Sequence, residues 1–131
     1  MLSIENAAVV CGEKIVVGGG VDIENGRIVA VRGPGEAAAR PADAVVDAQG
    51  ACLAPGFIDL HIHGLHEHLV DNGPEHLAAM AALLPRYGVT GWLPTVSPRP
   101  RGEDARFLQT LAQTRAPGAT VLGFHLEGPF L

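Results

Sequence analysis

The chain has 131 residues, of which 47% are hydrophobic and 18% are charged, a composition typical of a packed globular protein and not of a disordered one. Its formal net charge of −5 leaves no basic stripe for nucleic acid. No apolar run reaches the ~20 residues of a membrane helix, so we expect a cytoplasmic protein without a membrane partner. Cys11 and Cys52 form no CxxC pair, and we expect both to be reduced, half-buried strand residues.

Residues 1–53 are predicted to form a small antiparallel β-sheet, the β-sandwich portion of the protein. The apolar residues are mainly β-branched and come in short runs, which is typical of strands. These runs cover residues 7–10, 15–17, 21–23, 28–31 and 45–46. Turn-forming residues separate them, including the three glycines at 18–20, and Asn25-Gly26 is the pair most typical of a tight hairpin.

After Pro55-Gly56 the pattern changes to strands that alternate with helices, which predicts βαβ units and a parallel sheet. We expect strands over residues 57–63, 89–95 and 119–127, with helices over 74–84 and 103–115 between them. The apolar face of the first helix is predicted to be Leu77, Met80, Ala81 and Leu84. Phe57 and Trp92 are also expected in the core.

This β-α-β-α-β order fits either a small three-layer domain or the start of a (β/α)8 TIM-type barrel, a fold of ~250 residues. The sequence stops directly after the third predicted strand, without a helix to cover the sheet. Because parallel sheets are covered on both faces, we interpret residues 54–131 as the first units of an apparently truncated barrel. The predicted fold class is therefore α/β, with open sheet edges that favour self-association.

Two histidines with strand spacing end the first predicted barrel strand. His61 and His63 alternate with an apolar residue, and the period of two in a strand sends both imidazoles to one side. Catalytic groups collect at the carboxyl ends of barrel strands, and neutral imidazoles suit a divalent metal such as zinc or iron. A bare His-x-His pair also arises by chance. Asp59 faces the same way and could orient a metal ligand through a hydrogen bond, or could simply bond to backbone as a buried carboxylate.

The third predicted strand ends with His125 and Glu127, which places a carboxylate at the same rim of the sheet. Carboxylates are seldom buried without a partner, so packing alone does not explain this cluster. We therefore predict that His61, His63 and Glu127 bind metal. His125 lies one pleat deeper and is interpreted as a hydrogen-bonded core histidine. Thr95 could hydrogen-bond a ligand across the barrel mouth, or could bond its own backbone.

The remaining histidines are interpreted as unrelated to this cluster. His66 and His68 follow the first barrel strand in what we expect to be a solvated loop, although their spacing also fits a metal. His76 lies in the first turns of the predicted helix, where we expect it on the surface.

Three stretches of sequence resemble a known enzyme family. APGFIDLHIHG at residues 54–64 resembles the first barrel strand of the amidohydrolase superfamily. GVTGWLPT at residues 88–95 and GFHLEGPFL at residues 123–131 resemble the N-acetylglucosamine-6-phosphate deacetylases specifically. The resemblance implies a split β-sandwich followed by a metal-bearing barrel, of which this chain would be the amino-terminal portion.

The resemblance also implies an activity and a division of roles. The Glu of HLEGP is a metal ligand in that family, which maps onto Glu127, and in members with two metals the His-x-His pair, here His61 and His63, holds the other ion. The implied reaction is metal-assisted hydrolysis of the acetamide of an amino sugar phosphate, N-acetylglucosamine 6-phosphate, to glucosamine 6-phosphate and acetate. One or two ions would serve as cofactor, and family members are commonly homodimers. The general-base Asp and two further His ligands are expected beyond Leu131, so the isolated chain is expected to be inactive.

Two alternatives stay open. One is another amidohydrolase, dihydroorotase-like or hydantoinase-like, although those enzymes generally use a carboxylated Lys or a His where this chain has Glu127. The other is a non-catalytic, truncated metal-binding remnant. The run from Leu65 to His68 stands where family members often have a Gly-rich loop. The resemblance therefore indicates the sugar substrate less firmly than it indicates the metal chemistry.

Overall fold

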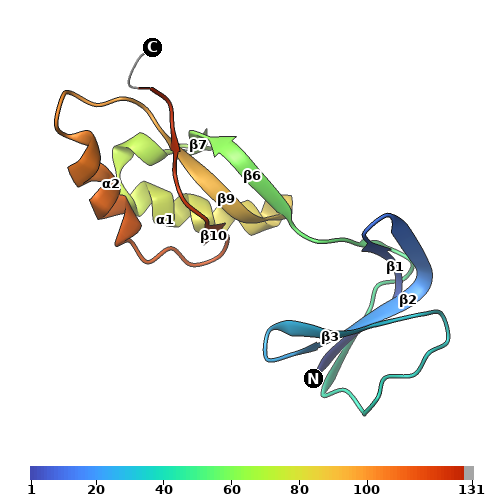
Figure 1. Ribbon diagram of the computed structural model, residues 1–131. Helices are drawn as coiled ribbons and strands as arrows, with labels where there is room; N and C mark the ends of the chain where they lie inside the picture. Colours follow the sequence, from blue (N-terminus) through green and yellow to red (C-terminus); the bar gives the residue numbers. More distant parts are fainter. Residues whose placement is uncertain (129–131) are drawn as a thin grey trace. The chain divides into compact units, whose positions relative to one another are not determined.

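The computed structural model describes residues 1–128, so Pro129 to Leu131, the end of the HLEGPFL motif, lie outside the described residues. The chain divides into two compact units, Met1–Pro55 and Gly56–Leu131 (Figure 1). The assignment of these units to a β-sandwich and a barrel stays a prediction. Within residues 1–128, no helix is both long and apolar enough to cross a bilayer.

The first unit is a five-stranded sheet in which β1 pairs with β2, β4 and β5. Its strands are β1 (Leu2–Cys11), β2 (Lys14–Glu24), β3 (Arg27–Arg32), β4 (Ala44–Asp47) and β5 (Cys52–Leu53). β1, β2 and β3 are antiparallel as predicted, and Asn25 and Gly26 both have positive φ, as a tight hairpin requires. The purely antiparallel sheet was wrong, because β4 and β5 run parallel to β1. Cys11 and Cys52 are free thiols and are exposed, not half-buried.

The three glycines at 18–20 do not form the predicted turn, because β2 continues through them. Gly18 has a positive φ of 68°, whereas Gly19 and Gly20 allow close backbone packing. A Cβ on Gly20 would lie 2.8 Å from the Ile4 carbonyl oxygen, and a Cβ on Gly19 would lie 2.7 Å from the Arg32 carbonyl oxygen. Glycine inside a strand often marks such an approach, and sequence alone does not separate this case from a turn.

A buried ion pair connects the first three strands. The Arg32 guanidinium on β3 lies 3.1 Å from Asp22 Oδ2 on β2, and Asp22 is 2% exposed. The Ser3 hydroxyl on β1 donates to Asp22 Oδ1 at 2.8 Å and accepts from Arg32 Nη2 at 2.7 Å. Loss of one charge would leave the other buried without compensation, which costs ~3–5 kcal/mol.

The second unit has a parallel sheet centred on β9 (Val89–Val96). β6 (Phe57–Ile62), β10 (Thr120–Val121) and β11 (His125–Leu126) each pair with β9 in parallel. The continuous strand predicted over 119–127 is thus interrupted between β10 and β11. The Leu122 N–H donates to the Trp92 carbonyl, and the next rung would require an N–H from Pro94, which has none.

Two helices accompany this sheet, close to the predicted ranges. α1 (Pro74–Leu83) begins at the proline that the sequence placed there and continues into the 3₁₀ turn η2 (Leu84–Tyr87), and α2 (Asp104–Ala112) lies between β9 and β10. A short hairpin of β7 (Gly64–Leu65) and β8 (His68–Leu69) and the 3₁₀ turn η1 (Val70–Asn72) connect β6 to α1.

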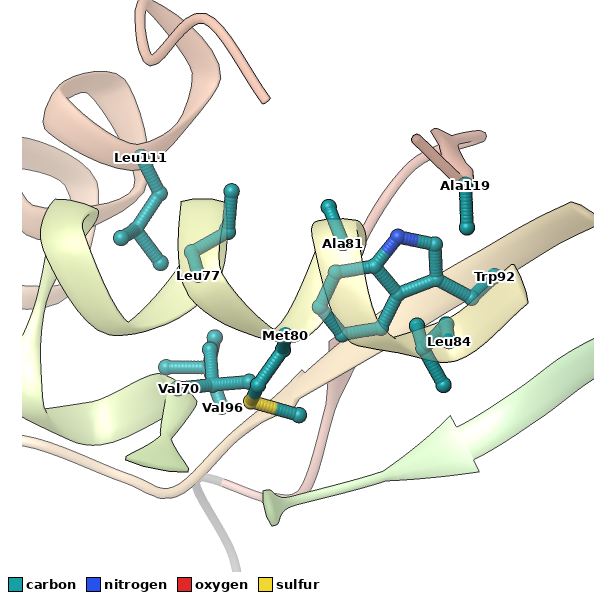
Figure 2. Close-up of a cluster of buried hydrophobic side chains, with 9 residues drawn as sticks. All are labelled: Val70, Leu77, Met80, Ala81, Leu84, Trp92, Val96, Leu111 and Ala119. Atoms are coloured by element: carbon teal, nitrogen blue, oxygen red, sulfur yellow. The ribbon is translucent and has the colours of Figure 1, made fainter. Parts of the chain in front are cut away.

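The core of the second unit brings together side chains from α1, η1, η2, β9 and α2 (Figure 2). It consists of Val70, Leu77, Met80, Ala81, Leu84, Trp92, Val96, Leu111 and Ala119. The predicted helix face and the burial of Trp92 are therefore confirmed. Phe57 was wrongly expected in the core: it is 69% exposed at the start of β6, and its ring lies against Gly88.

The described residues form open sheets and not a closed barrel or a two-sheet sandwich. Large apolar side chains are exposed on both units: Ile15, Val17, Ile28, Val45, Val46, Phe57, Ile58, Leu60, Leu122 and Leu126 are examples. Mixed α/β architecture is confirmed, whereas the (β/α)8 barrel stays a prediction.

Leu77→Ala tests the core. The side chain is 0% exposed, so its truncation should lower the free energy of unfolding by ~2–5 kcal/mol through lost burial and a residual cavity. Urea unfolding followed by the fluorescence of Trp92, the single tryptophan, would measure it. Leu122→Ala, at a position that is 54% exposed, should change the free energy by less than ~1 kcal/mol. Equal losses in the two variants would contradict this core.

Candidate metal centre

Two imidazoles and a carboxylate converge at the carboxyl end of the parallel sheet. The nitrogen and oxygen atoms that His61, His63 and Glu127 can offer to a metal all lie within 4.8 Å of one another. His61 Nε2 lies 3.3 Å from His63 Nε2, which in turn lies 3.1 Å from Glu127 Oε2. His61 Nε2 is 4.0 Å from Glu127 Oε1. The sequence predicted this convergence, and the structure brings the three residues together.

Strand pairing explains why residues far apart in sequence meet here. β6 and β11 both run parallel to β9, so their carboxyl ends lie at the same end of the sheet. The Glu127 N–H continues the ladder by donating to the Val96 carbonyl at 3.1 Å. On β6, Ile62 packs against the hydrophobic core, so the flanking His61 and His63 face away from the helices.

The donor atoms suit a divalent cation. A tetrahedral zinc ion with bonds of about 2.0–2.1 Å places its ligand atoms about 3.3 Å apart, close to the 3.3 Å and 3.1 Å separations that involve His63 Nε2. Two nitrogens and an oxygen also suit iron. The His61 side chain is 50% exposed and that of Glu127 39%, so the three donors remain accessible from solvent.

Asp59 and His125 contact the backbone beside this cluster. Asp59 Oδ1 accepts the His61 N–H at 3.0 Å, so its carboxylate bonds backbone and not an imidazole. His125 Nδ1 lies 3.2 Å from the Leu60 carbonyl oxygen, and its ring stacks on that of His61 with centroids 4.3 Å apart and planes at 23°. His125 is hydrogen-bonded as interpreted, but it is half-buried and lies outside the core.

Thr95 is fully buried on β9, directly across from His125 in the β9–β11 ladder. Its hydroxyl has no hydrogen-bond partner among residues 1–128, so it does not bond its own backbone. A contact between this hydroxyl and a ligand stays a prediction.

The other histidines are more ordered than expected, because the β7–β8 hairpin packs on α1. His68 and His76 are both half-buried, with ring centroids 5.4 Å apart in an edge-on arrangement. His66 Nε2 lies 2.8 Å from the Tyr87 hydroxyl. The pKa of the exposed Glu67 carboxyl lies below its usual value, first because the backbone N–H of Glu67 bonds to the carboxylate and then because His68 lies nearby. These residues contribute no ligand to the His61, His63 and Glu127 cluster.

No sequence motif indicated the polar cluster around Asp71. Asp71 accepts the Ser97 N–H at 3.2 Å and the Ser97 hydroxyl at 2.6 Å, while its carbonyl accepts from Arg99 Nη2 at 2.7 Å. The Arg99 guanidinium also lies 3.4 Å over the Phe107 ring. Ser97 and Glu127 line a common cavity of about 70 Å³. Asp71 thus fixes the chain just beyond β9, beside Glu127, and only tertiary contacts reveal this role.

Comparisons with known proteins place this geometry in context. No family model matches the chain. The N-acetylglucosamine-6-phosphate deacetylase of Bacillus subtilis (strain 168) is 32% identical over 99% of this chain and 34% of its own length. The N-acetylgalactosamine-6-phosphate deacetylase of Escherichia coli O157:H7 is 37% identical over 66% of this chain and 24% of its own length.

Solved structures of such deacetylases are similar to this chain over nearly its whole length. A variant of the N-acetyl-D-glucosamine-6-phosphate deacetylase from Mycobacterium smegmatis, in complex with N-acetyl-D-glucosamine-6-phosphate, superposes with a TM-score of 0.78 at 26% identity. The match covers 99% of this chain and 33% of that one. The chain is therefore a homologue of the amino-terminal portion of these amidohydrolases, as the sequence motifs predicted, and it spans about one third of the B. subtilis relative's length.

Glu127→Ala tests the cluster as a metal site. Removal of the only oxygen ligand should weaken zinc binding by at least about tenfold, as measured by competition with a chromophoric chelator. Glu67→Ala is the matched control, since it removes the same charge from a side chain that is 79% exposed and lies outside the cluster. Equal zinc affinity in the two variants would remove Glu127 from the ligand set.

Proposed function

We propose that this chain is part of a metal-dependent hydrolase that removes the acetyl group from an N-acetylated hexosamine 6-phosphate, with N-acetylglucosamine 6-phosphate as the first candidate. The observation that carries the proposal is the convergence of His61, His63 and Glu127 in a chain homologous to deacetylases of this kind. The relatives' activity belongs to proteins about three times as long, so the proposal concerns the protein of which this chain forms the amino-terminal portion.

The three residues of the cluster would act as ligands of a metal ion. His61 Nε2, His63 Nε2 and a carboxylate oxygen of Glu127 would hold a divalent cation, zinc or iron, as one ion or as part of a pair. The chemistry that such a cation supplies when bound is polarisation of an amide carbonyl and acidification of water near neutral pH. Glu127 adds a negative charge that offsets the charge of the cation. Since all three side chains are partly exposed, a substrate could approach them directly.

Proton transfer requires a further group. Asp59 is the acidic residue nearest to the histidines along β6, and its Oδ1 already accepts the His61 N–H. A general base must lie within hydrogen-bond reach of the proton it removes. We therefore assign this role to an Asp beyond Leu131, as the resemblance implies, and propose that residues 1–131 alone bind metal without turnover.

The substrate class follows from the relatives. One of them is named for N-acetylglucosamine 6-phosphate and another for N-acetylgalactosamine 6-phosphate. The acetamide, the phosphate and the hexose are common to both, so the chemistry proposed for the cluster applies to either. The hydroxyl configuration of the sugar is the feature that an experiment has to resolve.

Acetate release from both sugar phosphates, and from unphosphorylated N-acetylglucosamine, should be measured for the 131-residue chain and for the protein encoded with any in-frame downstream sequence. We expect chelator-sensitive activity with a sugar phosphate in the longer protein only. His63→Ala in that protein should lower kcat/KM by at least about a hundredfold, equivalent to ~2.7 kcal/mol.

Three other outcomes would contradict parts of the proposal. Turnover by the 131-residue chain itself would refute the expected external base. Metal binding without deacetylation in the longer protein would favour another amidohydrolase substrate, such as a cyclic amide. Neither metal binding nor activity would favour a non-catalytic remnant.

A further inference from the structure

The Leu60–His61 peptide group stands outside the regular ladder between β6 and β9. Asp59 pairs with Trp92 and Ile62 pairs with Pro94, so the register shifts between these two pairs. Three steps along β6 thus match two steps along β9, the pattern of a β-bulge, and an opposite shift between Phe57 and Ile58 precedes it. Bulges re-aim side chains, and this one lies immediately before the two histidines of the metal centre.

Side chains bond both polar ends of this peptide group. Its N–H, from His61, donates to Asp59 Oδ1 at 3.0 Å. Its carbonyl oxygen, from Leu60, lies 3.2 Å from His125 Nδ1. A carbonyl oxygen can only accept, so this hydrogen bond requires a proton on Nδ1 of His125.

We propose that Asp59 and His125 are positioning residues that form a peptide clamp, defined as these two hydrogen bonds to the Leu60–His61 peptide group. The clamp maintains the bulge and thereby sets where the His61 imidazole lies. His125 also supports that imidazole directly, because the two rings stack at 4.3 Å. The consequence for metal binding rests on the proposed function, whereas the clamp itself does not.

The size of the displacement shows why the clamp matters. Without the bulge, continued pairing from Asp59 and Trp92 would match His61, and not Ile62, with Pro94. Such a slip moves the strand by one residue, or about 3.3 Å. Metal–ligand distances tolerate deviations of only about 0.2 Å, so a slipped strand could not present both imidazoles to the ion that Glu127 reaches.

The clamp requires hydrogen bonds, and not the charge of Asp59. Asp59→Asn keeps a side-chain oxygen that can accept the His61 N–H, whereas Asp59→Ala removes the acceptor. His125→Phe keeps a flat ring for stacking on His61 but removes the donor to the Leu60 carbonyl. An electrostatic role of Asp59 toward the cation would instead make Asp59→Asn and Asp59→Ala similarly damaging.

The first test uses the metal-free 131-residue chain. We expect ¹⁵N NMR to show His125 with a protonated Nδ1, and we expect the His61 amide to exchange slowly with solvent. Exchange at His61 should accelerate by about tenfold or more in Asp59→Ala, as expected for loss of about 1.4 kcal/mol of local protection, and should stay near the parent rate in Asp59→Asn. A proton on Nε2 alone, or unchanged exchange in Asp59→Ala, would overturn the clamp.

The second test measures zinc affinity. Asp59→Ala and His125→Phe should each weaken binding about 10- to 100-fold, the effect typical of residues that orient metal ligands, with Asp59→Asn near the parent value. Because both side chains hold one peptide group, the double variant should lose less than the sum of the two single losses. Additive losses, or equal losses in Asp59→Asn and Asp59→Ala, would refute the clamp.

Failure of the proposed function gives a different result. If the parent chain binds no zinc, the proposed metal centre fails, yet amide exchange at His61 and the His125 protonation state still decide whether the clamp exists. If the parent chain binds zinc and neither alanine nor phenylalanine substitution changes affinity or exchange, the clamp is wrong and the metal centre stands.

Discussion

The parallel pairing of β6 and β11 with β9 is the constraint on which the candidate site depends. Without it, His61 and Glu127 would have no reason to meet, because they lie at opposite ends of the second unit's sequence. The backbone ladder fixes the direction of each strand. Asp71 continues this ordering past the end of β9, where it holds Ser97 beside the cavity that Glu127 lines.

Core packing and the candidate metal centre use the two faces of the same strand. Ile62 contacts the hydrophobic core while its neighbours His61 and His63 face away from the helices. Trp92 and Val96 on β9 likewise pack in the hydrophobic core. Thr95, which pairs with His125 on β11, has a hydroxyl without a hydrogen-bond partner in the described part of the chain. The packing of Ile62 against the core therefore helps to position the imidazoles of His61 and His63 on the opposite face of β6.

Local patterns were sufficient for features that depend on one segment. The apolar spacing of α1, the Asn25-Gly26 hairpin and the His-x-His alternation all follow from short-range geometry, and the structure agrees with them. The sequence misled where a distant residue decides. At Gly19 and Gly20, Arg32 and Ile4 approach the backbone of β2, and the strand predicted over 119–127 breaks because Pro94 on β9 lacks an N–H. The bulge at Leu60–His61 likewise depends on His125, which no local pattern around His61 could reveal.

The donors of the cluster lie on strands that pair with β9 over different lengths. β6 spans six residues, of which Phe57, Ile58, Asp59 and Ile62 pair with β9, whereas β11 consists of His125 and Leu126, which both pair with β9. Short ladders with few buried apolar contacts open locally at lower free energy than long ones. His61 and His63 are thus held by the longer ladder, and Glu127 by the shorter one. Of the three donors, the Glu127 carboxylate is therefore the one whose distance to the others depends on the fewest backbone pairs.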